Sequence, residues 1–182
     1  MDKDVKEHIK NLGSSDDKVR MSALQTILKL TDHNVDWVYD IWDDLFEKLK
    51  DDNSFQRSIA IMVICNLAKS DTEHRLSNSI DLLLAHTKDD KFITSRQCIQ
   101  NIWKLAFTSR QARDRVLDHL EKRFRECENE KHYNLIRTDI LQSIMLISDP
   151  KKDEALLARV RALVMEEKEA KYRKKYEALI GL

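Results

Sequence analysis

The amino-acid sequence predicts an all-α protein, specifically a right-handed α-solenoid of about four helical hairpins with a C-terminal capping helix. Three observations support this prediction. The 182 residues include only two glycines and one proline, so the residues that build tight turns between strands are scarce. No stretch shows the sustained alternation of apolar and polar residues that is typical of strands. One motif with helical spacing recurs about every 40 residues.

Apolar residues at helical spacing, separated by polar turns, predict a series of helices. The first helix ends at Gly13, a candidate C-cap, and Ser14, Ser15 and Asp16 offer N-cap side chains to the second. Helix 55–69 is the most apolar and is predicted to be the central buried element. In chain order the predicted helices span residues 2–12, 17–31, 35–50, 55–69, 73–87, 92–108, 110–127 and 132–148, with a last helix from about 151.

The last predicted helix starts after Asp149 and Pro150, because proline suits the first turn of a helix. Its apolar stripe stops at the charged stretch 166–169 and resumes, rotated, at Tyr172. We therefore expect its first half to cap the array, whereas the sequence leaves open whether its second half projects, frays or folds back onto the array. The prediction is one domain, with the repeat array in residues 1–150 and the capping helix in 151–182.

The recurring motif is an acidic turn followed by an arginine, a small residue and aliphatic residues. When the copies are aligned on the small residue, that position is held by Ala23, Ala60, Cys98 and Ile140. The successive offsets are 37, 38 and 42 residues. Aliphatic residues stand four and seven positions further on in each copy, which completes one apolar stripe of a helix. A single hairpin of this kind cannot bury its apolar face, so neighbouring hairpins are expected to stack.

At these residues the chain resembles the HEAT-repeat family, within the broader armadillo-like superhelices. The signature of the family's second helix has an aspartate in the turn, then Val-Arg, a small residue and aliphatic residues. The first copy matches it at Asp16 or Asp17, Val19, Arg20, Ala23, Ile27 and Leu30. The third copy departs from it, with Ser95 at the arginine position and Arg96 one residue late. The resemblance covers about residues 2–150.

The resemblance implies that the motif helices line the concave side of the array. It also implies that aspartates and arginines of successive turns form a hydrogen-bonded ladder. Charge-assisted pairs of this kind would fix the geometry between repeats. We therefore interpret four residues as structural members of the ladder, namely Asp17, Arg20, Arg57 and Arg137.

Positions on the motif helices that point away from the buried stripe are expected to face the concave groove. They are rich in amides, which can pair with the backbone of a bound peptide. The candidate partner-binding residues are Gln25, Lys29, Met62, Asn66, Gln100, Asn101, Lys104 and Gln142. The predicted function is non-catalytic protein–protein recognition or scaffolding, with a protein or peptide partner. The alternative is that these positions form a merely solvated face.

The alternative function is DNA binding, because some HEAT-like proteins are alkylpurine DNA glycosylases. Asp139, Trp103 and Lys104 would serve such a role, but the sequence shows no second catalytic partner. The net charge of zero and the few basic residues at inner positions disfavour nucleic acid. Residues 1–90 carry 12 basic and 18 acidic side chains, and residues 91–182 carry 20 and 14. This charge asymmetry leaves head-to-tail self-association open.

The sequence predicts no catalytic residue, metal site or cofactor. The histidines lack metal-binding spacing, and two glycines cannot build a glycine-rich phosphate loop. The cysteines Cys65, Cys98 and Cys127 form no paired motif and are expected to be core thiols, which suits a reducing compartment. The N-terminus lacks a signal peptide, and the longest apolar run is too short for a membrane span. We expect a cytoplasmic location and no contact with a membrane.

Overall fold

The computed structural model describes residues 1–148 and 153–181, and these residues form α-helices, short 3-10 helices and turns, without a β-strand. The predicted all-α class is therefore confirmed. The helices are α1 (Lys3–Asn11), α2 (Asp17–Leu30), α3 (Trp42–Lys48), α4 (Ser54–Leu67), α5 (Leu76–Ala85), α6 (Phe92–Ile99), α7 (Arg110–Glu126), α8 (Tyr133–Ile147), α9 (Glu154–Met165) and α10 (Ala170–Leu179). The 3-10 helices are η1 (Val38–Asp40), η2 (Ala68–Ser70), η3 (His86–Lys88), η4 (Ile102–Phe107) and η5 (Cys127–Asn129).

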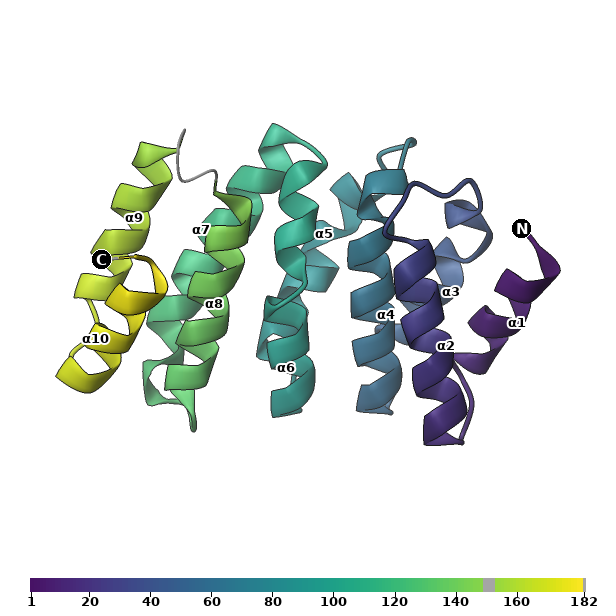
Figure 1. The fold of residues 1–182 in the computed structure, drawn as a ribbon, viewed down its shortest axis with the longest axis horizontal. Helices are drawn as coiled ribbons and strands as arrows, with labels where there is room; N and C mark the ends of the chain where they lie inside the picture. Colours follow the sequence, from purple (N-terminus) through teal and green to yellow (C-terminus); the bar gives the residue numbers. More distant parts are fainter. Residues whose placement is uncertain (149–152, 182) are drawn as a thin grey trace.

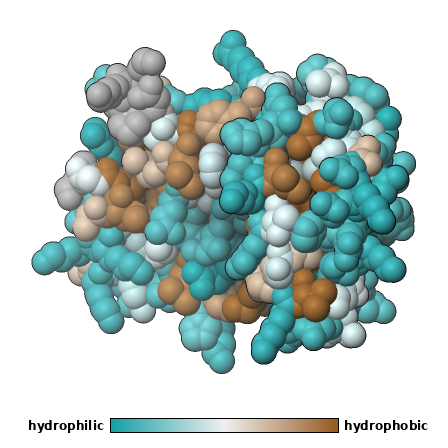
Figure 2. Space-filling view, turned by 45° about the vertical axis from the view of Figure 1, so that its right-hand side comes forward, coloured by the Kyte–Doolittle hydropathy of each residue, from teal (hydrophilic) through white to brown (hydrophobic). Residues whose placement is uncertain are grey.

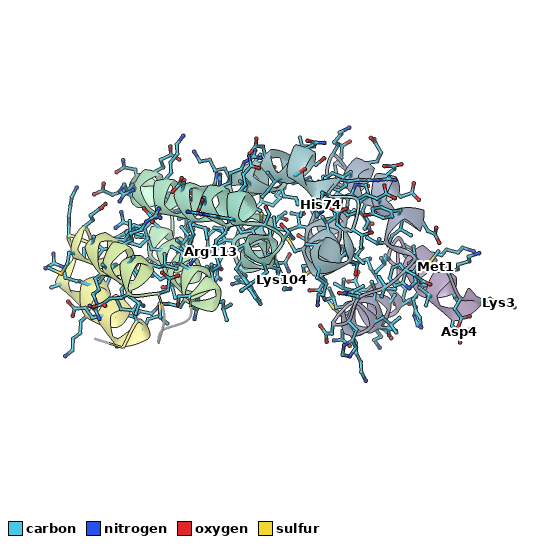
Figure 3. All side chains as sticks on the ribbon, turned by 90° about the horizontal axis from the view of Figure 1, so that it is seen from above. Met1, Lys3, Asp4, His74, Lys104 and Arg113 are labelled. Carbon is cyan, nitrogen blue, oxygen red and sulfur yellow. The ribbon has the colours of Figure 1, made fainter. Side chains whose placement is uncertain are left out.

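The helices stand side by side in the order of the chain, with the N-terminus at one end and the last two helices at the other (Figure 1). α2, α4, α6 and α8 form a front row, and α3, α5 and α7 lie behind it. Each front helix packs on the next, and α10 packs on α8. Seen from above, the rows bend so that the front row lies on the inner side of an arch (Figure 3). We call this side the inner face.

Side-chain caps begin two of the front-row helices, α2 at the predicted Asp16 and α4 at Asn53. The carboxylate of Asp16 accepts hydrogen bonds from the backbone N–H of Lys18 (2.8 Å) and Val19 (3.2 Å) at the start of α2. The side chain of Asn53 accepts one from Phe55 N–H (3.0 Å) at the start of α4. These bonds satisfy donors that have no partner within the helix, so the polar turns fix where each helix begins.

The core runs the length of the molecule between the two rows. Its centre is α4, in which every residue from Ile59 to Leu67 except Met62 is buried. α4 packs against α2, α3 and α6, so little of its surface is left for solvent. This burial explains why the helix is apolar all round, and it confirms the predicted central element.

Two predicted helices begin later than the sequence indicates. Of the predicted helix 35–50, only η1 and α3 are helical. The predicted helix 73–87 starts at Leu76, because His74 takes a left-handed backbone conformation (φ 56°). The carboxylate of Asp71 then caps the new start, accepting from the backbone N–H of Arg75 (3.0 Å) and Leu76 (2.7 Å).

The predicted helix 92–108 is broken into α6 and η4. Side chains take the carbonyl groups that a continuing α-helix would use at the break. Asn101 Nδ2 donates to Gln97 O (2.8 Å), and Trp103 Nε1 donates to Gln100 O (3.0 Å). Such local side-chain bonds compete with the helical ladder, and they change the direction of the residues that follow.

The single capping helix predicted for residues 151–182 is wrong, since α9 and α10 form a hairpin. The charged stretch between them is a turn, and Glu167 within it is buried. α10 folds back onto α8, where Tyr176 is fully buried beside Phe124. The predicted helix start at Asp149 and Pro150 lies outside the described residues. Within the described residues, no helix is both long and apolar enough to traverse a lipid bilayer.

Candidate partner-binding surface

The structure places most of the predicted partner-binding residues at or near the surface of the front row, and it buries one. The exposed residues are Gln25, Lys29, Gln100 and Gln142. The half-buried residues are Met62, Asn101 and Lys104. Asn66 is buried. In Figure 3, Lys104 is labelled on the side of the row that faces the open space of the arch.

Asn66 is only 5% exposed, so it offers a partner little of its side chain. Its Nδ2 donates to Leu28 O (3.0 Å) and to the hydroxyl of Thr31 (3.1 Å), which joins α4 to the end of α2. The prediction placed Asn66 away from the apolar stripe, but α4 is enclosed by neighbours and that position meets α2. Its amide therefore holds two front-row helices together.

Three further candidates, Gln100, Asn101 and Lys104, already form hydrogen bonds with neighbouring side chains. Gln100 Nε2 donates to Asp139 Oδ1 (2.9 Å), and Lys104 Nζ donates to Asn101 Oδ1 (2.7 Å). Burial, followed by the nearby charge of Lys69, lowers the pKa of Lys104. These polar groups keep one face towards the groove, but part of their hydrogen bonding is satisfied within the fold.

The inner face contains a groove whose lining includes one predicted partner-binding residue, Met62, while the sequence analysis missed the rest. It lies near the starts of α2, α4 and α6, has a volume of about 490 Å³, and we call it the N-terminal groove. Its large apolar side chains Met21, Phe55 and Ile93 are 55%, 63% and 60% exposed. The available signal was that these apolar residues stand outside the buried stripe of their helices.

A second groove, of about 600 Å³, lies near the ends of α2 and α4 and beside η4. We call it the lysine groove, and its lining is Leu28, Asp32, Cys65, Asn66, Lys69, Trp103, Lys104 and Phe107. A third, of about 450 Å³, includes Gln100, Gln142 and Leu146. Figure 2 shows hydrophobic surface in separate groups divided by hydrophilic residues. The inner face thus offers apolar contacts framed by polar ones.

The arginines assigned to a ladder differ in what they bind. Arg20 donates to Ser14 O (2.7 Å) and pairs with Asp17 in the same turn, so both residues act within the first hairpin. Arg57 binds both carboxylate oxygens of Asp89 (2.8 and 2.7 Å), in the turn before α6. Arg57 therefore spans two hairpins, whereas Arg20 does not.

Two further arginines link elements far apart in the chain. Arg137 donates to Glu167 Oε2 (2.7 Å), and this pair is almost wholly buried. Arg96 binds both oxygens of Asp139 (2.6 and 3.0 Å), which joins α6 to α8. In the sequence, Arg96 stands out only because it lies one residue after the arginine position of the motif. Nothing in the motif indicates that Asp139 is its acceptor.

The contacts of Asp139 bear on the DNA glycosylase alternative. Asp139 is 2% exposed, and its carboxylate accepts hydrogen bonds from both Arg96 and Gln100. A carboxylate that is enclosed and neutralised in this way cannot meet a nucleotide without breaking the link between α6 and α8. The geometry makes Asp139 a structural residue.

The basic side chains of α7, on the rear row, are mostly neutralised by acidic partners. Ion pairs join Arg113 to Asp153, Arg115 to Asp81, Arg123 to Glu130, Arg125 to Glu166 and Lys122 to Glu126. Nucleic-acid binding depends on side-chain cations that displace the counterions of the phosphates. Arginines already paired with carboxylates are less available for this. The basic second half of the sequence therefore does not give a free basic surface on this helix.

The cysteines are buried thiols. Burial raises the pKa of Cys65 to about 12, and it also raises the pKa values of Cys98 and Cys127. In the part of the chain that the structure describes, no group of three or more His, Cys, Asp or Glu side chains could hold a metal ion.

Comparison with protein-family models finds no match for this chain, and comparison with curated protein sequences finds none either. Comparison with solved structures finds 17 matching chains. One of them is the crystal structure of an engineered protein from the Northeast Structural Genomics Consortium, with a TM-score of 0.54 and 13% sequence identity. The match covers 97% of this chain and 77% of the engineered chain. At this identity the likeness concerns the fold alone.

Proposed function

We propose that the protein is a non-catalytic recognition module that binds a protein or peptide partner on its inner face. The observation that carries this proposal is the exposure of Met21, Phe55 and Ile93, which lie together in the N-terminal groove. Large apolar side chains gathered in one groove favour contact with another molecule over contact with water. Three successive front helices supply one residue each, so the surface depends on the stacking of the row.

The arrangement that we propose for the array is a right-handed, HEAT-like α-solenoid. Its support is the repeated pairing of a front helix with a rear helix, at the offsets read from Ala23, Ala60 and Cys98. Further support comes from Arg57, which reaches the acidic turn of the following hairpin. With a ladder of this kind, the sequence repeat determines the curvature of the inner face.

The chemistry of the charged groups favours binding over catalysis. The carboxylates of Asp89, Asp139 and Glu167 each accept hydrogen bonds from an arginine, and Cys65 is held as a neutral thiol. Groups neutralised in this way are poor nucleophiles or general bases. Buried free cysteines also suit a reducing compartment such as the cytoplasm, which we propose as the location.

The test is affinity capture from the source cell with a triple variant, M21S/F55S/I93S. These side chains are mostly exposed, so the substitutions should leave the fold intact while removing the apolar contacts. The matched control is L82S/M165S, which replaces two apolar residues that are 54% and 61% exposed and lie outside the groove. Circular dichroism verifies that both variants fold.

We expect partners of the wild-type chain to be lost with the triple variant and retained with the control. Partners that survive the triple variant and disappear with L82S/M165S would place the binding surface elsewhere. If the captured species is a second copy of this chain, the sedimentation coefficient of the purified protein should rise with concentration, and high salt should weaken an association between oppositely charged halves.

A further inference from the structure

The lysine groove brings two ammonium groups to one end of the inner face. Lys69 comes from η2, at the end of α4, and Lys104 comes from η4. The lining contains one carboxylate, that of Asp32. Two ammonium groups against one carboxylate give the lining a net positive charge. The groove is therefore a locally positive site.

The two lysines differ from the arginines that link the helices in their partners. Lys69 Nζ donates to the backbone oxygen of Asp32 (2.9 Å), and Lys104 Nζ donates to the amide oxygen of Asn101 (2.7 Å). Both acceptors are neutral, and within the described residues neither lysine forms a salt bridge. By contrast, Arg57 and Arg137 each bind a carboxylate. The lysine groove thus contains positive charge that the fold itself does not neutralise.

Burial makes this charge costly for the free protein. Desolvation is the first cause of the lowered pKa of Lys104, and the repulsion from Lys69 adds to it. An incoming carboxylate would oppose both effects, because it attracts the two ammonium groups and water screens the half-buried Lys104 poorly. The groove therefore favours an acidic ligand over a neutral or basic one.

The wall beside the lysines is aromatic. The rings of Trp103 and Phe107 meet edge to face, with centroids 6.0 Å apart and planes at 89°. Phe107 is 65% exposed, and Leu28 lies in the same lining. Such a wall can accept an apolar side chain next to the site where the lysines hold a carboxylate.

We propose that the lysine groove binds an acidic peptide segment of a protein partner. A carboxylate of the segment lies between Lys69 and Lys104, and a neighbouring apolar side chain packs on Trp103 and Phe107. This inference rests on the proposed function and names the chemical class of the partner. It concerns a different groove from the one that the capture experiment alters.

A peptide fits these observations better than a nucleic acid. Single-stranded nucleic acids need a positively charged track that follows the backbone, together with exposed faces for base stacking. The groove offers two lysines beside Asp32, and one of them already lies over the ring of Trp103, with Lys104 Nζ 5.7 Å from its centroid. The arginines of the rear helix α7 are largely paired, so they do not extend the site into such a track.

The test measures fluorescence anisotropy with three labelled probe peptides that share an apolar centre. The acidic probe is Glu-Glu-Leu-Phe-Glu-Glu, and the neutral and basic probes have Gln or Lys in place of Glu. We expect the full chain to bind the acidic probe at least roughly tenfold more tightly than the neutral one, since charged hydrogen bonds exceed neutral ones. Rising salt should reduce this difference.

The variants separate the roles of charge and apolar contact. K69Q and K104M should each reduce the affinity for the acidic probe roughly fivefold to tenfold. K69E should reverse the preference, so that the basic probe binds more tightly than the acidic one. Lys69 is exposed, so K69E is expected to fold even if a change at the half-buried Lys104 proves harmful. F107A should reduce the affinities for the acidic and neutral probes by the same factor. The control K6Q/K10Q removes two positive charges from α1 and should change nothing.

Several results would overturn the proposal. Equal affinity for all three probes, unchanged binding in K69Q and K69E, or no binding of the acidic probe at millimolar concentration would each do so. Tighter retention of oligo(dT) than of the acidic peptide at matched charge would assign the groove to nucleic acid. A failure here leaves the capture result with M21S/F55S/I93S standing, because that variant leaves every lining residue of the lysine groove unchanged.

Discussion

Arg57 and Asp89 stand 32 positions apart in the sequence and are joined by two parallel hydrogen bonds, from Nε (2.8 Å) and from Nη2 (2.7 Å). The same guanidinium donates to the backbone oxygens of Asp51 (2.8 Å) and Asp52 (3.1 Å). It therefore connects the turn before α4 with the turn before α6. The planar fork of arginine permits one arrangement of these turns, so the pair restrains how successive hairpins are stacked.

Replacing Arg57 by methionine (R57M) tests this restraint. We expect the free energy of unfolding to fall by about 2–3 kcal/mol, because the carboxylate of Asp89 would lose its charged donors while its surroundings remain buried. Urea unfolding followed by circular dichroism measures the loss. The control is Lys50→Met, since Lys50 and its partner Glu47 are 70% and 75% exposed and contribute little. Equal losses in R57M and K50M would show that the connection does not stabilise the stack.

The same pair predicts how acid affects the protein. Burial alone would raise the pKa of Asp89, but hydrogen bonds from Arg57, Lys91 N–H and His86 outweigh it and hold the pKa below its usual range. The folded state then binds the proton more weakly than the unfolded state. Asp89 thus stabilises the fold above its unfolded pKa of about 4, and this contribution is lost as the pH falls from there through the lowered pKa.

The measurement is the free energy of unfolding of the wild type and of D89N as a function of pH. D89N should be less stable near neutral pH and should lose less stability on acidification below about pH 4, because the asparagine does not titrate. Two curves that stay parallel over this range would show that Asp89 is not a source of the acid sensitivity.

The features that were predicted correctly are those that depend on residues close together in the sequence. The all-α class, the cap at Asp16 and the central position of α4 follow from turn residues and helical spacing. Each of these properties depends on residues within a few positions of one another. The start predicted at residue 17, for example, matches α2, where Asp16 caps the first turn.

Long-range relations could not be predicted from that spacing. The break after α6 depends on Asn101 and Trp103 capturing carbonyl groups, and a stripe of apolar residues carries no sign of it. Asn66 was assigned to the groove because its position points away from the stripe, but its amide is buried and bonded to the end of α2. The N-terminal groove was missed because apolar residues outside the stripe, such as Phe55, gain a meaning only when three helices are placed together.

His119 predicts a second dependence on pH. Its Nε2 lies 2.8 Å from the hydroxyl of Thr87, and burial, followed by the charges of Lys88 and Arg123, lowers its pKa. As the pH falls below the unfolded value of about 6.5, the unfolded chain takes up the proton before the folded chain does. The stability contributed by neutral His119 is therefore present above this pH and is lost as the pH falls through the lowered pKa.

The measurement is the midpoint of urea unfolding at neutral and mildly acidic pH. The His119→Gln variant should show a smaller decrease between these conditions than the wild type, because the amide stays neutral. His33→Gln, at an exposed histidine, is the control and should keep the slope of the wild type. If H119Q and H33Q behave alike, another group controls the stability in this range.

The C-terminal hairpin predicts a stabilising role for α10, a segment for which the sequence alone left open whether it projects or folds back. The side chain of Tyr176 is fully buried, its ring lies 6.2 Å from that of Phe124, and its hydroxyl donates to Asn134 O (3.2 Å). Tyr176→Ala should therefore lower the free energy of unfolding by about 3–5 kcal/mol, as expected for the loss of a buried aromatic ring. Tyr176→Phe should cost only about 1 kcal/mol, the contribution of one hydrogen bond. The exposed neighbour Lys175, changed to alanine, should leave the unfolding midpoint unchanged, whereas a Y176A variant as stable as K175A would mean that α10 does not pack on α8 in solution.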